Sequence, residues 1–541
     1  MLQGLTIVLV ISYLIIIGYL GYRGFRGTQS ATDYLVAGRQ VHPFIMALSY
    51  GATFISTSAI VGFGGAAALF GMSLLWLTFL NIFVGIFVCF VFLGARTRAM
   101  GHGLDAHTFP ELLGRRFNSG FLQVFAGLVI LLFMPLYTAV VSMGAAKVIE
   151  VTFDAPYTAS LFFFCAIVAL YVVMGGLKGV MYTDAMQGGI MFLGMVLLIV
   201  LTYGKLGGVA EAHERLTSLA PRALEVFGKA GHQGWTSMPA FGSPFWWTVV
   251  STIVMGVGIG VLAQPQLAVR FMTVKSQREL NRAVLVGGIF ILAMTGIAFT
   301  VGALSNVFFV EDPEIGSIAF LAADKNVEQI IPMFIERYMP GWLSSIIVVT
   351  LLAAAMSTVS SQFHAMGTAA GRDIFGTLAR GRVGSTAATR TGVLLTFVLS
   401  ASLAYILPIM FEKTGTAIIA RGTAIFFGLC CSTFLPMYVG ALYSRGITKA
   451  GALSGMLVGF LASGFWLLFM HKKESEALQL CNWLFGVPSL ADGKVTGPII
   501  WTEVDPLFVA FPLAVIVTII VSLFTRKYSQ EHLDHCFARI R

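Results

Sequence analysis

The sequence contains few charged residues. Asp, Glu, Lys and Arg together make up 11% of its 541 residues, whereas soluble domains contain about 25%. This low charge, with a mean hydropathy of +0.86, excludes an ordinary water-soluble enzyme. His, Asp and Glu are also scarce within the apolar segments, which disfavours a catalytic centre inside a membrane. The six cysteines have no metal-ligand spacing, and four of them lie inside apolar spans, where a buried thiol is usually a small packing residue.

The formal net charge of +9 does not indicate nucleic-acid binding. The basic residues lie mostly in short connections between apolar segments, which is typical of residues that set membrane topology. The first apolar stretch lacks a basic leader and a small-residue cleavage site. It is therefore interpreted as a retained membrane span and not as a cleaved signal peptide.

Long apolar segments recur along the whole chain, each of about 20 residues or more, enough to cross about 30 Å of hydrocarbon. They predict an all-α polytopic membrane protein. The predicted spans are 5–22, 43–70, 73–95, 121–150, 157–174, 183–206, 245–267, 281–305, 341–371, 390–410, 416–443, 449–470 and 505–525.

Lys and Arg gather in alternate connections, which predicts an N-terminus outside and a C-terminus inside the cell. The second and seventh spans then cross in opposite directions, as the first helices of two inverted five-helix repeats would. Periodicity permits this repeat without proving it. The expected organisation is a first helix and inner loop over 1–42, a first repeat over 43–206, an outer loop over 207–244, a second repeat over 245–443, and two peripheral helices with a cytoplasmic tail over 444–541.

The segment 50–71, "YGATFISTSAIVGFGGAAALFG", is apolar but carries four hydroxyl side chains and several glycines. A helix interrupted in a bilayer frees backbone carbonyl groups that hydrocarbon cannot satisfy, and a small hard cation is a suitable partner for them. Small residues also favour close helix packing. Taken alone, this segment favours packing.

A second hydroxyl-rich segment, 351–375, places Ala354, Ser357, Thr358 and Ser361 on one helical face. Neutral oxygen ligands suit sodium, which is a hard cation. The alternative is that each hydroxyl bonds back to its own helix. Ser360 extends this face by one position, and a broad stripe of four hydroxyls is less easily explained in this way.

Asp184 lies at the start of the apolar span 183–206. An ionisable side chain in such a span is by default a functional candidate. Capping of a helix N-terminus explains it equally well, so both interpretations stay open here.

The chain resembles the sodium:solute symporter family, and the resemblance covers nearly its full length. It is closest in appearance to the pantothenate and monocarboxylate branch. The motifs that carry the resemblance are "YLVAGR" (34–39), "TFPELLGRRF" (108–117), "GGLKGVMYTDAMQG" (175–188), "AQPQLAVRFM" (263–272), "AAAMSTVSSQ" (353–362) and "LYSRGITKAGALSGMLVG" (442–459).

The resemblance implies a leucine-transporter-like fold, in which ten core helices form a 5+5 inverted repeat within the thirteen transmembrane helices that hydropathy predicts. It also leads us to predict two sodium sites. The principal site would use the backbone carbonyls of Ala52, Ile55 and Ala354 and the hydroxyls of Ser357 and Thr358. The second site, nearer the cytoplasm, would use Asp184, Ser357, Ser360 and Ser361.

Thr57 and Ser58 are expected to contact the solute beyond the first helix break, with Val257 and Val261 of the second broken helix. These two valines stand where proline-transporting relatives look aromatic, which disfavours proline. Arg421 lies inside an apolar span and is a candidate partner for a solute carboxylate. It could instead reach the headgroups or pair with Glu412.

The expected function is sodium-coupled import of a small organic solute, most simply a monocarboxylate or pantothenate-like carboxylate, by alternating access. A proline-like amino acid is the alternative, as is a proton in place of sodium. A sensory membrane module without transport is a candidate of a different class. We expect no enzymatic activity and no obligatory protein partner, with the lipid bilayer of a bacterial plasma membrane as surroundings. His364 is expected to be a packed or hydrogen-bonded core residue.

Overall fold

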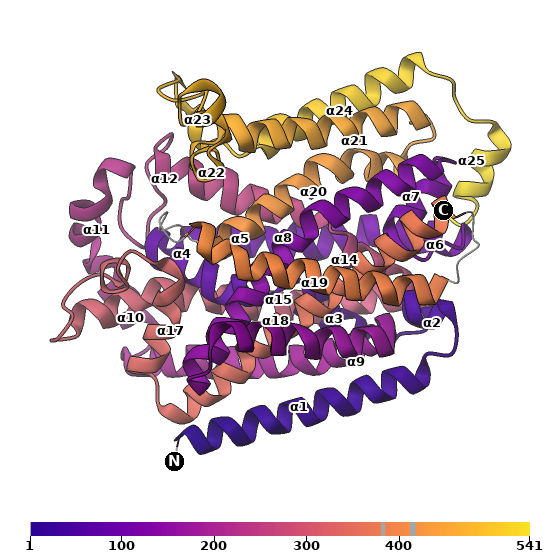
Figure 1. Ribbon diagram of the computed structural model, residues 1–541. Coiled ribbons are helices and arrows are strands. Elements are labelled where there is room, and N and C mark those ends of the chain that lie inside the picture. The colour runs from indigo at the N-terminus through magenta and orange to yellow at the C-terminus, as the bar shows by residue number, and fades with distance from the viewer. Residues whose placement is uncertain (1, 380–384, 412–417, 541) are drawn as a thin grey trace.

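Long helices running roughly side by side form most of the molecule (Figure 1). The computed structural model describes residues 2–379, 385–411 and 418–540. Within these ranges, eleven helices are long and apolar enough to cross a membrane. The prediction of an all-α multi-pass membrane protein is confirmed.

The first 205 residues are almost entirely helical. Their elements are α1 (Leu2–Gly27), α2 (Ala31–Val36), α3 (Pro43–Phe54), η2 (Ser58–Gly62), α4 (Phe63–Phe70), α5 (Leu75–Ile82), η4 (Phe83–Gly94), α6 (Ala95–Gly103), α7 (Phe109–Arg116), α8 (Gly120–Phe153) and α9 (Tyr157–Lys205).

The middle of the chain alternates short and long helices. Its elements are α10 (Val209–Ser218), α11 (Ala220–Phe227), α12 (Pro244–Trp247), η6 (Thr248–Val257), α13 (Gly258–Gly260), η7 (Val261–Ala263), α14 (Pro265–Ala268), η8 (Val269–Thr273), α15 (Gln277–Glu311), α16 (Ala319–Ala322), α17 (Val327–Tyr338), α18 (Gly341–Thr368) and η9 (Ala369–Gly376).

The C-terminal part adds further helices and a small antiparallel hairpin in which Val495 pairs with Ile500. Its elements are α19 (Ser385–Phe411), α20 (Ile418–Tyr443), α21 (Lys449–Phe465), η10 (Trp466–Met470), α22 (Lys472–Leu478), α23 (Leu480–Phe485), β1 (Val495–Thr496), β2 (Ile499–Ile500), α24 (Leu507–Phe524) and α25 (Gln530–Phe537).

Two of the apolar helical runs are long enough to cross a membrane twice. Helix α9 has 49 residues and bends at Gly176, whose φ is 54° and ψ is −156°. A Cβ atom there would lie 2.6 Å from the Tyr34 ring, so both the conformation and the space require glycine. The run Ser58–Gly103 bends in the same way at Gly71, whose φ is 75°. These bends leave room for more than eleven spans, and the count of thirteen stays a prediction.

The first predicted helix break lies between α3 and η2. Ile55 has an extended backbone, with φ −92° and ψ 102°, and its N–H still donates to Gly51 O at 2.9 Å. Helical structure resumes at Ser58, in a π-helical turn. The carbonyls of the last turn of α3 therefore lose the regular partners that a continuous helix would give them.

A second break follows η7. Gln264 is extended, with φ −74° and ψ 116°, and Pro265 starts α14. A residue before proline is driven out of the helical region, and proline has no N–H to continue the ladder. The sequence thus ends the helix locally, without help from packing.

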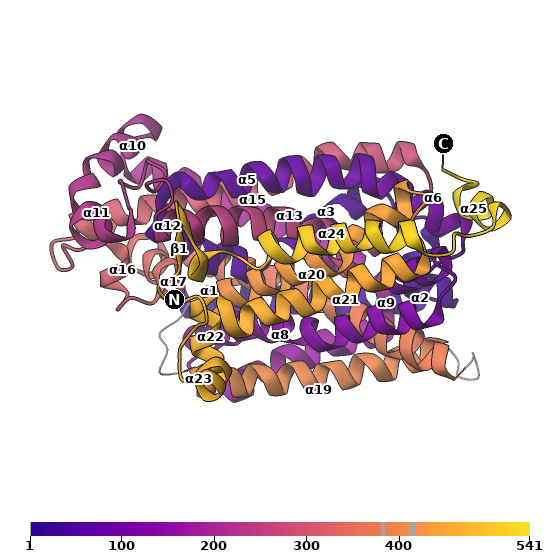
Figure 2. The same cartoon turned by 90° about the horizontal axis from the view of Figure 1, so that it is seen from above.

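The broken helix α3 lies at the centre of the bundle and packs against α9, α15 and α18. Helix α1 forms one edge of the molecule, and α21 and α24 form the opposite edge (Figure 1). Helices α10, α11 and α23 gather at the end that holds the N-terminus, while α6, α25 and the C-terminus lie at the other end (Figure 2). The two termini are thus at opposite ends of the bundle.

Candidate ion and solute site

The end of α3 meets the middle of α18. Ser357 Oγ lies 2.8 Å from Ala52 O and 3.1 Å from Ala354 O, and Thr358 Oγ1 donates to Thr53 O at 3.1 Å. The carbonyls that the helix break releases are therefore satisfied by hydroxyls of the serine-rich helix. All of these residues are buried. A hard monovalent cation fits this set, because these contacts are made by neutral carbonyl and hydroxyl oxygens.

Four of the five residues predicted for the principal site are joined by these contacts or are adjacent along α18 (Ala52, Ala354, Ser357 and Thr358). Ile55 is the extended residue at the break and is buried, but none of these hydroxyls contacts its carbonyl. The structure adds Thr53, whose carbonyl accepts from Thr358. An interrupted helix frees several consecutive carbonyls, and only packing decides which of them a neighbouring helix reaches.

Asp184 is completely buried and lies within α9, well past the bend at Gly176. The helix-cap interpretation is wrong, because α9 continues through this position. Asp184 Oδ2 accepts from Ser49 Oγ at 2.9 Å and Thr53 Oγ1 at 3.2 Å, both on α3. Asp184 therefore ties α9 to the broken helix.

The serines of α18 also reach Asp184. Ser360 Oγ lies 3.3 Å from Oδ1, and Ser361 Oγ lies 3.3 Å from Oδ2. Ser357 is one turn away, and its carbonyl accepts from both serines at 3.0 and 2.9 Å. The four residues predicted for the second sodium site thus lie together.

A buried arginine lies in the same cluster. Arg270 of η8 forms an ion pair with Asp184, with 2.8 Å between Nη2 and Oδ2, and both side chains have no exposed surface. Arg270 lies within the motif "AQPQLAVRFM", and no role was predicted for it. The signal was present, because a guanidinium at the end of an apolar segment needs a buried partner.

A small cavity of about 20 Å³ lies just beyond the break in α3. Ser58 and Val257, two predicted solute contacts, line it. Thr57 and Val261 are not among the described residues that line it, and the side chain of Arg421 lies outside the described part of the chain. The other lining residues are Phe54, Ile55, Ser56, Ala59, Phe63, Leu77, Asn81, Tyr137, Thr295, Phe299, Thr423 and Phe427.

The described lining of this cavity combines aromatic, aliphatic and uncharged polar side chains. Ser58 Oγ lies 2.6 Å from Ser56 Oγ and accepts from Thr423 Oγ1 at 3.0 Å. Asn81 Oδ1 is buried and has no hydrogen-bond partner. Asn81 and Thr423 come from helices distant in sequence, so no local pattern could indicate them. A cavity of about 20 Å³ holds about one water molecule, so a solute would enter only after the cavity widens, and it would then meet ring faces, hydroxyls and the unpartnered amide oxygen of Asn81.

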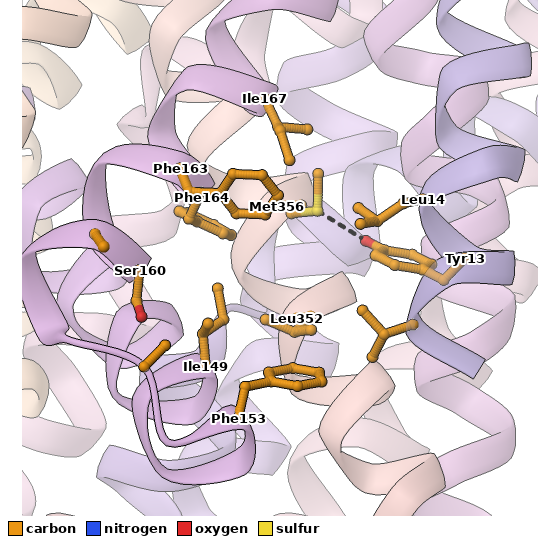
Figure 3. A pocket seen from close by; sticks show the side chains of 13 residues that line it. Tyr13, Leu14, Ile149, Phe153, Ser160, Phe163, Phe164, Ile167, Leu352 and Met356 are labelled. Carbon is orange, nitrogen blue, oxygen red and sulfur yellow. Dashed lines mark hydrogen bonds between the residues drawn. The ribbon is translucent and has the colours of Figure 1, made fainter. Parts of the chain in front are cut away.

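A larger, almost wholly apolar cavity of about 410 Å³ lies between α1, α8, α9 and α18 (Figure 3). Tyr13 and Met356 point toward each other in its wall, where Tyr13 OH donates to Met356 Sδ at 3.2 Å (Figure 3). The Tyr13 hydroxyl also accepts from Gln187 Nε2 at 2.9 Å. Gln187 lies on α9, one turn after Asp184. Of the described lining residues, Tyr13 and Ser160 carry hydroxyls, and both hydroxyls are already bonded within the protein, so the wall that this cavity presents to a solute is apolar.

Charged residues join α7 to the C-terminal end of the serine-rich helix. Glu111 accepts from Arg372 Nε at 2.8 Å and from Arg115 Nη2 at 2.6 Å. Burial by itself would raise the pKa of Glu111, but hydrogen bonds from His107 and Arg372 hold this pKa well below its usual range. His364, as predicted, is a buried residue with a partner, since its Nε2 lies 3.0 Å from Tyr34 O.

The sequence profile of the Sodium:solute symporter family matches residues 34–459. The chain belongs to this family. The osmoregulated proline transporter OpuE of Bacillus subtilis is 28% identical over 457 residues, which cover 84% of this chain and 87% of OpuE. A sodium/proline symporter of Staphylococcus aureus is 28% identical over 538 residues, or 96% of this chain and 93% of that protein. The placement in the pantothenate branch is not confirmed by these relatives.

Solved structures of symporters share the fold. A Na⁺-coupled sialic acid symporter superposes with a TM-score of 0.73 at 17% identity, covering 97% of this chain and 98% of that one. Mhp1, a nucleobase-cation-symport-1 family transporter, has a TM-score of 0.50 at 14% identity, with 94% and 98% covered. The predicted leucine-transporter-like fold is thereby confirmed.

Proposed function

We propose that this protein imports a small organic solute by coupling its movement to that of sodium. The observation that carries the proposal is the junction of α3 and α18, where Ser357 Oγ lies within 3.1 Å of the carbonyls of Ala52 and Ala354. Carbonyl and hydroxyl oxygens from two helices meet at a helix break beside a buried cavity. Membership of a family of sodium-coupled symporters supports the same conclusion.

The principal sodium ion would be held by Ala52, Ile55, Ala354, Ser357 and Thr358. Rotation of the Ser357 and Thr358 hydroxyls away from the α3 carbonyls would present their lone pairs to the ion. The second ion would be held by Asp184, Ser357, Ser360 and Ser361. The second site contains a carboxylate, whereas the principal site contains neutral oxygens only. The second site therefore has the stronger requirement for a cation, because a buried carboxylate requires a counter-charge.

Coupling follows from the position of the principal site between α3 and α18. A cation shared by the two helices stabilises the conformation in which they are close, and the neighbouring cavity is shaped by the same α3 segment. Each ligand then favours the conformation that the other prefers, so the binding of sodium raises the affinity for the solute and the binding of the solute raises the affinity for sodium by the same factor. Inward sodium movement gains about 2.3 kcal/mol per charge for each 100 mV of inside-negative potential.

The solute proposed is small and bears a carboxylate. A monocarboxylate or pantothenate-like solute suits the aliphatic Val257 in the cavity wall, with Arg421 as the candidate anchor for the carboxylate and Thr57, Ser58 and Val261 as further contacts. Proline is the second candidate, since similar proteins are named as proline transporters. Proline also carries a carboxylate, and the ring-lined cavity offers faces against which its ring could pack.

The surroundings proposed are the lipid bilayer of a bacterial plasma membrane, with the N-terminus outside and the C-terminus in the cytoplasm. The opposite positions of the two termini in the bundle are compatible with this orientation. No obligatory protein partner is proposed. Labelling of single cysteines introduced into α10 and α25 tests the orientation. A membrane-impermeant reagent added to intact cells should reach the position in α10 but not the position in α25.

The decisive experiment is uptake into proteoliposomes that hold the purified protein. Labelled proline, lactate and pantothenate are each offered with an inward sodium gradient, with choline in place of sodium, and with a proton gradient alone. We expect uptake of one of the carboxylates that requires sodium and rises with an inside-negative potential. Empty liposomes give the background.

Three outcomes would change the proposal. Uptake driven equally well by the proton gradient alone would replace sodium with a proton. Uptake of proline alone would select the second solute. If a wide panel of solutes gave no uptake while sodium still altered the stability of the protein, a sensory module would be the better interpretation.

A further inference from the structure

Arg270 occupies the centre of the cluster around Asp184. It belongs to η8, directly after the second helix break, and its side chain has no exposed surface. Its Nε donates to Ser49 Oγ at 3.0 Å, and its Nη1 donates to the carbonyl of Gln266. Helices α3, α9 and α18 all supply acceptors to this one side chain.

The third nitrogen of the guanidinium is crowded with oxygens. Arg270 Nη2 carries two hydrogens but lies 2.5 Å from Ser361 Oγ, 2.6 Å from Thr53 Oγ1 and 2.8 Å from Asp184 Oδ2. At least one hydrogen must therefore be shared. Three hard oxygens this close to one positive nitrogen are also suited to a small cation, which binds oxygens without hydrogen-bond geometry.

Two of these acceptors belong to the predicted second sodium site. Asp184 supplies its charge, and Ser361 supplies one of its hydroxyls. Ser360 reaches the other carboxylate oxygen, Oδ1, at a longer 3.3 Å. A sodium ion at this site would have to share the carboxylate with the guanidinium or displace it.

Sharing is unfavourable, because two cations against one buried carboxylate leave a net positive charge without solvent to screen it. Displacement is possible, because Arg270 lies on an element separate from those that carry Asp184 and Ser361. Movement of η8 away from α9 would free the oxygens without disturbing the helices that hold them.

We propose that Arg270 is a tethered cation that competes with the second sodium ion for Asp184. Competition of this kind requires the second sodium site of the proposed function. When sodium leaves, Arg270 neutralises the carboxylate, so that the empty carrier can change conformation without a buried unpaired charge. When sodium binds, the contact of η8 with α3 and α9 is released. Arg270 also keeps sodium affinity low enough for release.

The test measures sodium binding to the full-length protein in nanodiscs, without solute, as the sodium concentration that gives half of the maximal rise in melting temperature. Arg270→Gln removes the charge and keeps an amide donor. We expect this concentration to fall about tenfold. Arg270→Lys keeps a cation with fewer donors and should lie between Arg270→Gln and the wild type.

Arg116→Gln is the matched control. Arg116 is equally buried, but it contacts the carbonyls of Ala441 and Ser444 and not the ion-site residues. Its replacement should leave the half-maximal sodium concentration unchanged. A second pair of variants guards against misfolding: Asp184→Asn alone, and Asp184→Asn with Arg270→Gln, which removes both buried charges together. Because competition acts through Asp184, these two should have the same sodium requirement.

The proposal is overturned if Arg270→Gln raises the half-maximal sodium concentration or leaves it at the wild-type value. It is also overturned if Arg270→Gln changes the sodium requirement as strongly in the Asp184→Asn background as in the wild type. A wild-type protein that shows no sodium response contradicts the proposed function as well. If the wild type shows sodium-driven uptake but Arg270→Gln leaves the half-maximal sodium concentration unaltered, the competition is refuted and the proposed function stands.

Discussion

Ser357→Ala is the sharpest perturbation of the principal sodium site. The hydroxyl lies 2.8 Å from Ala52 O and 3.1 Å from Ala354 O, so its loss removes one of the five proposed ligands and leaves the other oxygens in place. A hydrogen bond or ligand contact to a charged group contributes about 1.5–3 kcal/mol. Since 1.4 kcal/mol corresponds to a factor of ten, the sodium concentration for half-maximal uptake should rise about 10- to 100-fold.

The assay is solute uptake into proteoliposomes at a series of sodium concentrations and at saturating solute. Ser345→Ala on the same helix is the matched control, because Ser345 Oγ contacts Thr6 Oγ1 at 2.8 Å and lies about 18 Å from Ser357 along the helix axis. It should leave the sodium requirement unchanged. If Ser357→Ala also left it unchanged while the protein remained folded, the principal site would have to be placed elsewhere.

Three further variants test the small cavity beyond the break in α3, the ion pairs of Glu111, and the close packing of α15 against α4. Asn81→Ala removes the buried amide oxygen beside the cavity and should raise the solute concentration for half-maximal uptake about tenfold, without altering sodium binding to the solute-free protein. Glu111→Gln should lower the melting temperature at pH 7. Because the pKa of Glu111 is lowered in the folded protein, its ionised carboxylate stabilises the fold fully above pH 4.5, the usual pKa of a glutamate, and this stabilisation is lost as the pH falls below 4.5. The difference in melting temperature from the wild type should therefore shrink below pH 4.5, and a difference that persisted there would refute the electrostatic explanation. Gly302→Ala would place a Cβ atom 2.0 Å from Gly64 O and should destabilise the protein, whereas Gly288→Ala on the same helix meets nothing within 4 Å and should not.

Much of the architecture follows from local chemistry that a sequence displays directly. The apolar runs require membrane helices, because only hydrogen-bonded helices can cross hydrocarbon in an all-α chain. The second break at Gln264 is set by Pro265, and the bend at Gly176 is set by a conformation that glycine alone adopts easily. The serine stripe on α18 could be found from its helical spacing alone.

The sequence could not show which groups meet across the bundle. Asp184 allowed two interpretations until the long α9 was seen to continue through it. Arg270 and Asp184 are separated by 86 positions, and only the packing of η8 against α3 and α9 brings them to 2.8 Å. Asn81 and Thr423 line the small cavity beyond the break in α3 for the same reason.

Residue type and spacing, then, determined the class of protein, its helices and the two hydroxyl-rich segments. Tertiary structure decided which carbonyl each hydroxyl reaches, which cation faces Asp184 and which side chains border the cavity. The physical reason is the distance along the chain over which each effect acts. Helix propensity, proline and glycine effects act over a few residues, whereas an ion site is assembled from oxygens that the fold gathers from distant segments.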